Sequence, residues 1–240
     1  MEHPPFDTLR IDKKFCGPPK SGNGGYVSGI LAKYIDGVAE VSLRQPPPLN
    51  TNLQVVKVDD RVQLFKGDLL IAEAKPSSLT MDIPSAPGPS TAELASRSYV
   101  GFENHYFPSC FVCGPKRGEG DGLRIFTGPT PNRQVVAAPW TPHDSLFDKN
   151  GELPSEFYWA ALDCPGAYAV HESKESMKVL GRLTAKIERP IHKGERLIVT
   201  GWDLGSEGRK FYSGTAIYEE DGTPKAYAQA IWIEINKKSF

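Results

Sequence analysis

The stretch GNGGYVSGILAKYI at residues 22–35 decides the fold that the sequence predicts. It begins with a glycine cluster, which favours a turn. Beyond the cluster, apolar side chains recur at helical spacing, at Val27, Ile30, Leu31, Tyr34 and Ile35. We therefore expect a helix that opens directly from a glycine turn.

Alternating segments follow this helix. Ala39, Val41 and Leu43 point to one side of a strand, and the residues between them point to the other. The same reasoning predicts strands at 53–58, 62–65 and 69–74, with a hairpin turn at 66–68. The first half is thus one helix followed by an antiparallel meander.

The same order returns in the second half of the chain. Residues 75–98 hold four prolines among small and polar residues, which is typical of a linker. A helix is expected around 154–170, followed by strands at 181–188, 196–202, 210–218 and 225–235 and a hairpin turn at Asp221-Gly222. Each half has the pattern of an antiparallel sheet wrapped around one helix.

These elements predict an α+β fold of two antiparallel sheets, each wrapped around a central helix, joined as one continuous pseudo-dimer. The expected modules are residues 1–78 and 105–240, with a linker at 79–104. A length of 240 residues is sufficient for two such modules, each with its own core.

Composition narrows the classes of partner. With 28 basic and 29 acidic residues the net charge is -1, so nucleic acid is not an expected partner. Neither a secretory signal nor an apolar run of membrane-spanning length is seen, so we expect a cytoplasmic protein without membrane contact. A homodimer formed through sheet edges is compatible with the pattern.

The spacing of the cysteines gives only an incomplete metal-binding motif. Cys110-x-x-Cys113 is one half of a zinc motif, but no second such pair and no histidine pair accompany it. Four cysteines are also too few for a disulfide scaffold. The sequence therefore predicts neither a metal nor another cofactor.

Two motifs resemble those of the hot-dog thioesterases. Gly24-Gly25 at the start of the first helix, with an Asp inside the second, is similar to tandem enzymes such as bacterial acyl-CoA thioesterase II. CFVCGP at 110–115, followed by GLRI at 122–125, resembles the opening segment of small hot-dog thioesterases of the phenylacetate-pathway type. The resemblance covers nearly the whole chain and implies that the protein binds, and hydrolyses, an acyl thioester such as an acyl-CoA.

The resemblance also implies a composite site. In small dimeric members, a glycine element at one helix start faces an Asp on the partner's helix. Here the glycine element is 23–25, but the position seven residues after Gly25 is Ala32; the second half has Asp163, but Glu156 seven residues before it and no glycine pair. We hypothesise one complete site between the halves and one inactive site.

Asp163 is the only charged residue from Phe157 to Val170, in the stretch FYWAALDCPGAYAV. Burial raises the pKa of a carboxyl group toward the range of a general base. The alternatives are a helix cap at a break before Pro165 or an exposed position on a short helix.

Two residues of the later strands are further candidates. Acyl-CoA thioesterase II has a Gln on its last strand that helps hold the attacking water, and Gln229 resembles it in position. The alternative is a structural hydrogen bond to a neighbouring backbone group. Where that enzyme has a Thr, this chain has Asp203, a candidate third member.

The amides of Gly24, Gly25 and Tyr26, together with Asn23, are expected at a helix N-terminus, where N–H groups polarise a thioester carbonyl. A plain glycine turn is the alternative. The first hypothesis is a thioester hydrolase acting on a CoA or carrier-protein thioester. A non-catalytic acyl-CoA binder or sensor comes second, and a hydratase last, because no Asp is followed by His five residues later.

Overall fold

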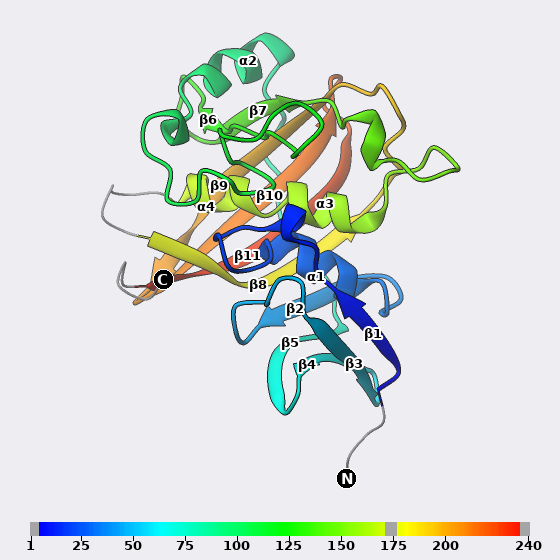
Figure 1. Cartoon of the computed structure of the whole chain (residues 1–240). Coiled ribbons are helices and arrows are strands. Elements are labelled where there is room, and N and C mark those ends of the chain that lie inside the picture. The colour runs from blue at the N-terminus through cyan, green and yellow to red at the C-terminus, as the bar shows by residue number, and fades with distance from the viewer. Residues whose placement is uncertain (1–4, 171–176, 236–240) are drawn as a thin grey trace.

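The computed structural model describes residues 5–170 and 177–235. Within these residues, eleven strands form one continuous antiparallel sheet that curves around a central group of helices (Figure 1). The sheet order is β1-β3-β4-β5-β2-β8-β11-β10-β9-β7-β6.

The first half of the chain contains one helix and five strands. In chain order they are β1 (Asp7–Arg10), α1 (Gly24–Ala32), β2 (Ala39–Leu43), β3 (Asn52–Val58), β4 (Arg61–Lys66) and β5 (Leu69–Pro76), with a short 3-10 helix, η1 (Lys13–Phe15), after β1. Strand alternation predicted four of these strands, and helical spacing predicted α1.

The second half repeats this arrangement with a divided helix. Its elements are β6 (Gly128–Pro129), β7 (Val136–Trp140), η3 (Asp144–Leu146), α3 (Ser155–Ala161), α4 (Cys164–Ala169), β8 (Met177–Ile187), β9 (Leu197–Glu207), β10 (Lys210–Glu219) and β11 (Pro224–Ile235). Between the halves lie α2 (Pro89–Arg97) and η2 (Val100–Phe102).

The halves meet where β2 pairs with β8. Ala39 lies opposite Ala185 and Val41 lies opposite Leu183 in this antiparallel pair. Moving outward from the junction, the order is β5, β4, β3, β1 on one side and β11, β10, β9, β7 on the other, where the short β6 adds one more strand at the edge. Corresponding strands therefore occupy corresponding places, and the expected two sheets are a single sheet joined at this pair.

On the inner side of the sheet, α1 crosses α3 at very short range. A Cβ atom added at Gly25 would lie 2.4 Å from the Trp159 carbonyl oxygen, and one added at Gly29 would lie 2.5 Å from the Glu156 Cα. Only glycine permits such an approach of two backbones. The glycines of the first helix thus set how closely the halves pack.

Two expectations about helices are corrected. The helix expected around 154–170 is interrupted at Leu162 and Asp163, and Pro165 lies in the first turn of α4, where its missing N–H is tolerated. The predicted linker, whose composition is unfavourable for helices and strands, contains the helix α2. Pro89 is at the start of α2, where its fixed φ favours the first helical turn.

The linker lies against the outer face of the second half of the sheet. Leu79, Met81 and Ile83 pack with Trp202 and Tyr227 in a separate apolar cluster. The Tyr218 hydroxyl donates to the Pro84 carbonyl oxygen at 2.7 Å. Both faces of this part of the sheet are therefore covered.

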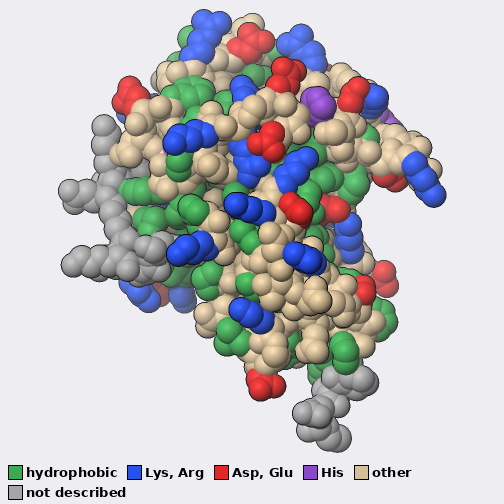
Figure 2. All heavy atoms as spheres, in the orientation of Figure 1, with side chains coloured by type: hydrophobic (Ala, Val, Ile, Leu, Met, Phe, Trp, Pro, Cys, Tyr) green, Lys and Arg blue, Asp and Glu red, His purple; other side chains and the backbone are tan. Residues whose placement is uncertain are grey.

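The surface carries mixed charge. On the face seen in Figure 2, basic and acidic side chains are interspersed rather than gathered by sign. None of the helices described here is both long and apolar enough to cross a membrane.

Candidate active site

Asp163 joins the two halves at the break between α3 and α4. Its side chain is buried, and Oδ2 accepts a hydrogen bond from the Asn23 side-chain amide at 2.7 Å and another from the Gly25 backbone N–H at 2.9 Å. The structure thus brings together the glycine element and the Asp that the sequence analysis assigned to one composite site.

Asn23 fixes the geometry of this contact. Its Oδ1 accepts from the Tyr26 N–H at 2.9 Å and caps α1, so its Nδ2 must point toward Asp163. The carboxylate therefore lies at the positive end of a nine-residue helix. Asn suits this position because its side chain has both an acceptor, which caps the helix, and a donor, which binds the Asp163 carboxylate.

The protonated, neutral form of Asp163 is more favoured in this buried environment than it would be in water. Burial raises the pKa of Asp163 to about 7, and the hydrogen bonds from Gly25 and Asn23 oppose part of this effect. Its Oδ1 is buried and has no hydrogen-bond partner among the described residues. One oxygen is thus held in place while the other is free to accept a proton.

Asp163 lines a cavity of about 310 Å³. Gly24 and Asn23 form part of the wall beside it, and the apolar part of the wall includes Leu180 and Trp232. A cavity with apolar walls and a few polar groups is typical of a site for a small organic ligand.

The backbone amides near the cavity are not equally free. The Gly25 N–H donates to Asp163 and the Tyr26 N–H donates to Asn23. The Gly24 N–H has no acceptor among the residues that the structure describes. Of the amides expected to bind a carbonyl oxygen, Gly24 is therefore the one available.

Gln229 and Asp203 do not join this group. Ala228 and Ala230 face the helices, so Gln229 between them faces the opposite side of β11, where it is exposed. Asp203 is exposed on β9 and accepts from the Gly205 N–H at 2.7 Å. Alternation correctly put Gln229 on a face with Tyr227, but that face is the outer one.

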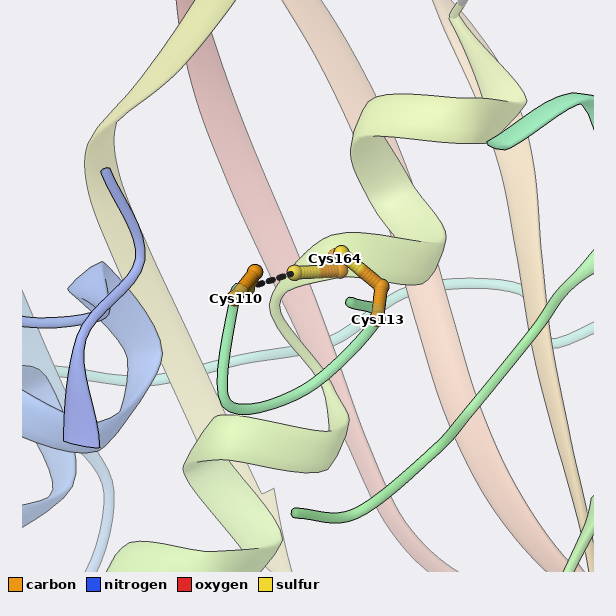
Figure 3. A group of neighbouring side chains, drawn as sticks. All are labelled: Cys110, Cys113 and Cys164. Atoms are coloured by element: carbon orange, nitrogen blue, oxygen red, sulfur yellow. Dashed lines mark hydrogen bonds between the residues drawn. The ribbon is translucent and has the colours of Figure 1, made fainter. Parts of the chain in front are cut away.

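Three cysteines near Asp163 form a cluster that the sequence analysis did not assemble. Cys110, Cys113 and Cys164 are buried, and their side chains meet at one point of the cavity wall (Figure 3). Hydrogen bonds from the Cys113 and Cys164 thiols hold the pKa of Cys110 well below its ordinary value. The Cys-x-x-Cys spacing and a Cys directly after Asp163 were the available signals.

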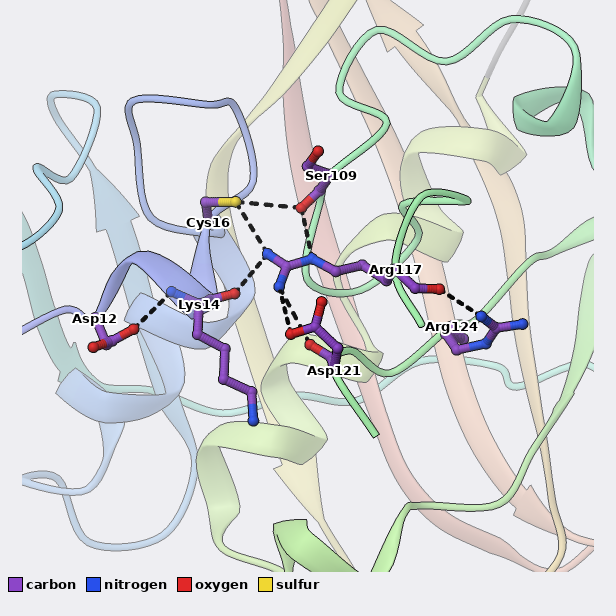
Figure 4. A network of polar contacts seen from close by, with 7 residues as sticks. All are labelled: Asp12, Lys14, Cys16, Ser109, Arg117, Asp121 and Arg124. Carbon is purple, nitrogen blue, oxygen red and sulfur yellow. Dashed lines mark hydrogen bonds and ion pairs between the residues drawn. The ribbon is translucent and has the colours of Figure 1, made fainter. Parts of the chain in front are cut away.

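Arg117 fastens the loop that carries two of these cysteines. Its guanidinium donates to the Ser109 carbonyl oxygen at 2.8 Å and to the Lys14 carbonyl oxygen at 2.7 Å, and it pairs with Asp121 at 3.1 Å (Figure 4). It also contacts the Cys16 Sγ at 3.2 Å. The loop is thereby held against the N-terminal segment.

At the other end of the crossed helices the corresponding residues make no such site. Glu156, at the start of α3, forms an ion pair with Lys33 at 2.6 Å. Ala32 stands where a second Asp would be needed. The two positions therefore differ in their side chains and in the partners of their carboxylates.

Comparison with protein-family models gives no match, and neither does comparison with curated proteins. Solved structures do match over the full length. A TesB protein of Mycobacterium avium subspecies paratuberculosis has a TM-score of 0.62 at 14% identity, covering 95% of this chain and 92% of that one. The acyl-CoA thioesterase II TesB2 of Mycobacterium marinum has a TM-score of 0.57 at 11% identity, covering 100% and 98%.

A third matching structure is described as having a hot-dog fold. A conserved protein of unknown function with a hot-dog fold from Alicyclobacillus acidocaldarius has a TM-score of 0.50 at 8% identity, covering 95% of this chain and 92% of that one. At these identities the likeness concerns the fold. The chain therefore has an α+β hot-dog fold, at the double length seen in the acyl-CoA thioesterase II structures.

Proposed function

We propose that this protein hydrolyses acyl thioesters, with acyl-CoA as the substrate class, in the cavity beside Asp163. The observation that carries the proposal is the contact of the buried Asp163 with Asn23 and Gly25 across the two halves. This contact fixes one carboxylate oxygen, and the other has no hydrogen-bond partner among the described residues. Full-length likeness to structures named acyl-CoA thioesterase II supports the choice of substrate.

The reaction needs a base and a donor to the carbonyl oxygen. In the proposed mechanism, Asp163 Oδ1 accepts a proton from a water molecule while the water oxygen attacks the thioester carbon. The Gly24 N–H donates to the oxyanion that forms. When the C–S bond breaks, the thiolate takes the proton from Asp163, which gives a carboxylic acid and a free thiol.

The apolar cavity wall would hold the acyl group. Leu180, Trp232 and Ala167 contribute to this wall. Because they exclude water from all but the reacting end, the charge that develops in the transition state is poorly screened. Donors already in place then stabilise it without reorganising.

The direct test is thiol release from a panel of short, long, branched and aromatic acyl-CoAs. Asp163→Asn keeps the shape of the side chain but removes the base, so we expect the rate to fall about 100-fold or more. Asp203→Asn is the matched control, since this exposed carboxylate lies away from the cavity and its loss should leave the rate unchanged. Equal rates for wild type and Asp163→Asn would refute the assignment.

A second candidate is a binding protein for acyl-CoA that performs no chemistry. The exposed positions of Gln229 and Asp203 favour it, because they leave Asp163 without the strand residues expected to help hold a water. Calorimetry with a non-hydrolysable thioether analogue of acyl-CoA separates the two functions. Tight binding by wild type, with no thiol released from any member of the panel, would select the binding protein.

A further inference from the structure

The thiol cluster, defined as Cys110, Cys113 and Cys164, has no task in the proposed hydrolysis. Two members come from the loop before β6, and the third is the first residue of α4, so the cluster connects two separate parts of the chain. Their three sulfur atoms all lie within 4.8 Å of one another. The Sγ atoms of Cys110 and Cys164 are 3.7 Å apart.

This spacing is that of ligands around a single ion. Tetrahedral zinc with Zn–S bonds of about 2.3 Å separates neighbouring sulfur atoms by roughly 3.8 Å. Thiols alone gain little from such convergence, because S–H groups are weak donors and acceptors. Buried cysteines that only fill space do not need to direct their sulfur atoms at one point, as they do here (Figure 3).

The same chain offers a comparison. Cys16 is also buried, but its Sγ contacts the Ser109 carbonyl oxygen at 3.3 Å and the Arg117 guanidinium at 3.2 Å. It is outside the group of candidate ligands. Cys16 is therefore a buried thiol with a structural environment, and it serves as the internal control for the cluster.

A histidine lies next to the sulfur atoms. His105 Nε2 is 3.3 Å from the Cys113 Sγ and lines the same cavity. Its Nδ1 accepts a hydrogen bond from the Phe107 N–H at 2.9 Å, so Nε2 carries the proton and donates to the Cys113 carbonyl oxygen at 3.1 Å. His105 is therefore a neighbour of the cluster and not one of its ligands. The sequence analysis argued against a metal because Cys110-x-x-Cys113 had no second pair. Folding supplies Cys164 from a position without a recognisable spacing.

We propose that Cys110, Cys113 and Cys164 bind one soft divalent metal ion of the Zn²⁺ class. The ion replaces the thiol protons and ties the loop to α4. Because Asp163 directly precedes Cys164, the same ion would stabilise the backbone that positions the carboxylate. The proposal does not depend on hydrolysis and can hold for a binding protein equally.

The ion can be measured without any activity assay. Protein freed of metal with a chelator and kept reduced under anaerobic conditions is titrated with Co²⁺, whose thiolate complexes show charge-transfer bands and intense visible d–d bands. We expect saturation at one equivalent per chain, with loss of the bands on addition of Zn²⁺. Elemental analysis of protein purified without chelator should give one zinc per chain.

Variants identify the ligands. Cys164→Ser and Cys113→Ser should each weaken Co²⁺ binding on the order of 100-fold or more, while Cys16→Ser should bind as wild type does. Thermal unfolding of each variant without metal shows that it is folded before titration.

Two outcomes would overturn the proposal. One is a reduced, folded wild-type chain that gives no thiolate-to-cobalt band at any Co²⁺ concentration. The other is equal weakening by Cys16→Ser and Cys164→Ser, which would mean that the sulfur atoms of the cluster are not the ligands. Neither result bears on thiol release by Asp163, so the two proposals can fail separately.

Discussion

The two ends of the crossed helices α1 and α3 offer nearly equivalent surroundings but hold different chemistry. At one end Asp163 is buried and hydrogen-bonded to a backbone amide and to Asn23. At the other end Glu156 pairs with Lys33, whose side chain is 43% exposed. The scaffold alone therefore does not make a site; the difference comes from the partner of each carboxylate, which is a backbone amide and Asn23 at one end and a lysine at the other.

The largest difference between the two ends is expected in activity. It is tested by measuring whether thiol release requires Asp163 or Glu156. We expect Asp163→Asn to lower thiol release about 100-fold or more and Glu156→Gln to leave it nearly unchanged, because Asp163 lines the cavity and Glu156 does not. Initial rates with one acyl-CoA at saturating concentration decide it. Equal losses would mean that both ends are active.

Gly25 is the next point of difference. A Cβ at this position would lie 2.5 Å from the Asp163 Cβ, so Gly25→Ala must push the helices apart. We expect a loss of about 1–3 kcal/mol in the free energy of unfolding. Urea denaturation measures it, with Gly118→Ala as control, since nothing lies within 4 Å of a Cβ there. A Gly25→Ala protein as stable as the control would contradict the close crossing.

Substitution of Asn23 tests how much its cap of α1 and its hydrogen bond to Asp163 contribute to stability. Asn23→Ala removes the helix cap and one donor to Asp163, so we expect a loss of about 1–2 kcal/mol in the free energy of unfolding. Asn52→Ala, at an exposed strand position, should change it by less than about 0.5 kcal/mol. Denaturant midpoints at constant slope compare the two. A change no larger than that of the control would show that the cap and the donor do not matter.

Lys33 gives the smallest expected effect. Lys33→Met breaks an ion pair whose cation is partly exposed, so we expect a loss of at most about 1 kcal/mol and no change in thiol release. Lys75→Met is matched, because its side chain is equally exposed, at 43%, and pairs with Glu40. A much larger effect for Lys33 would mean that its ion pair supports the packing of the helices.

The sequence predicted those helices and strands that a single local residue pattern is sufficient to identify. Alternation located most strands, and helical spacing located α1. It did not reveal β1 or β7, which are short and lack clear alternation. Alternation also tells which residues share a face but not which face is covered by helices, so Gln229 was placed correctly along its strand and assigned to the wrong side.

The candidate site was predictable only in part for a similar reason. Resemblance to tandem thioesterases suggested that Asp163 meets the glycine element, and these residues do lie in contact. Cys164, by contrast, is 54 residues from Cys110 in the sequence, and no pattern between them predicts that they lie close together. Their meeting depends on how the loop held by Arg117 lies against α4, which is a property of tertiary packing.

The pairing of β2 with β8 gives the site a property that a two-chain assembly lacks. When a site is shared between separate subunits, dilution separates its parts, and every substitution appears twice. Here the parts of the site lie on one chain, so Asn23 and Asp163 meet at a concentration fixed by the connection between the halves rather than by the amount of protein. Each end of the helix pair is also free to change without altering the other.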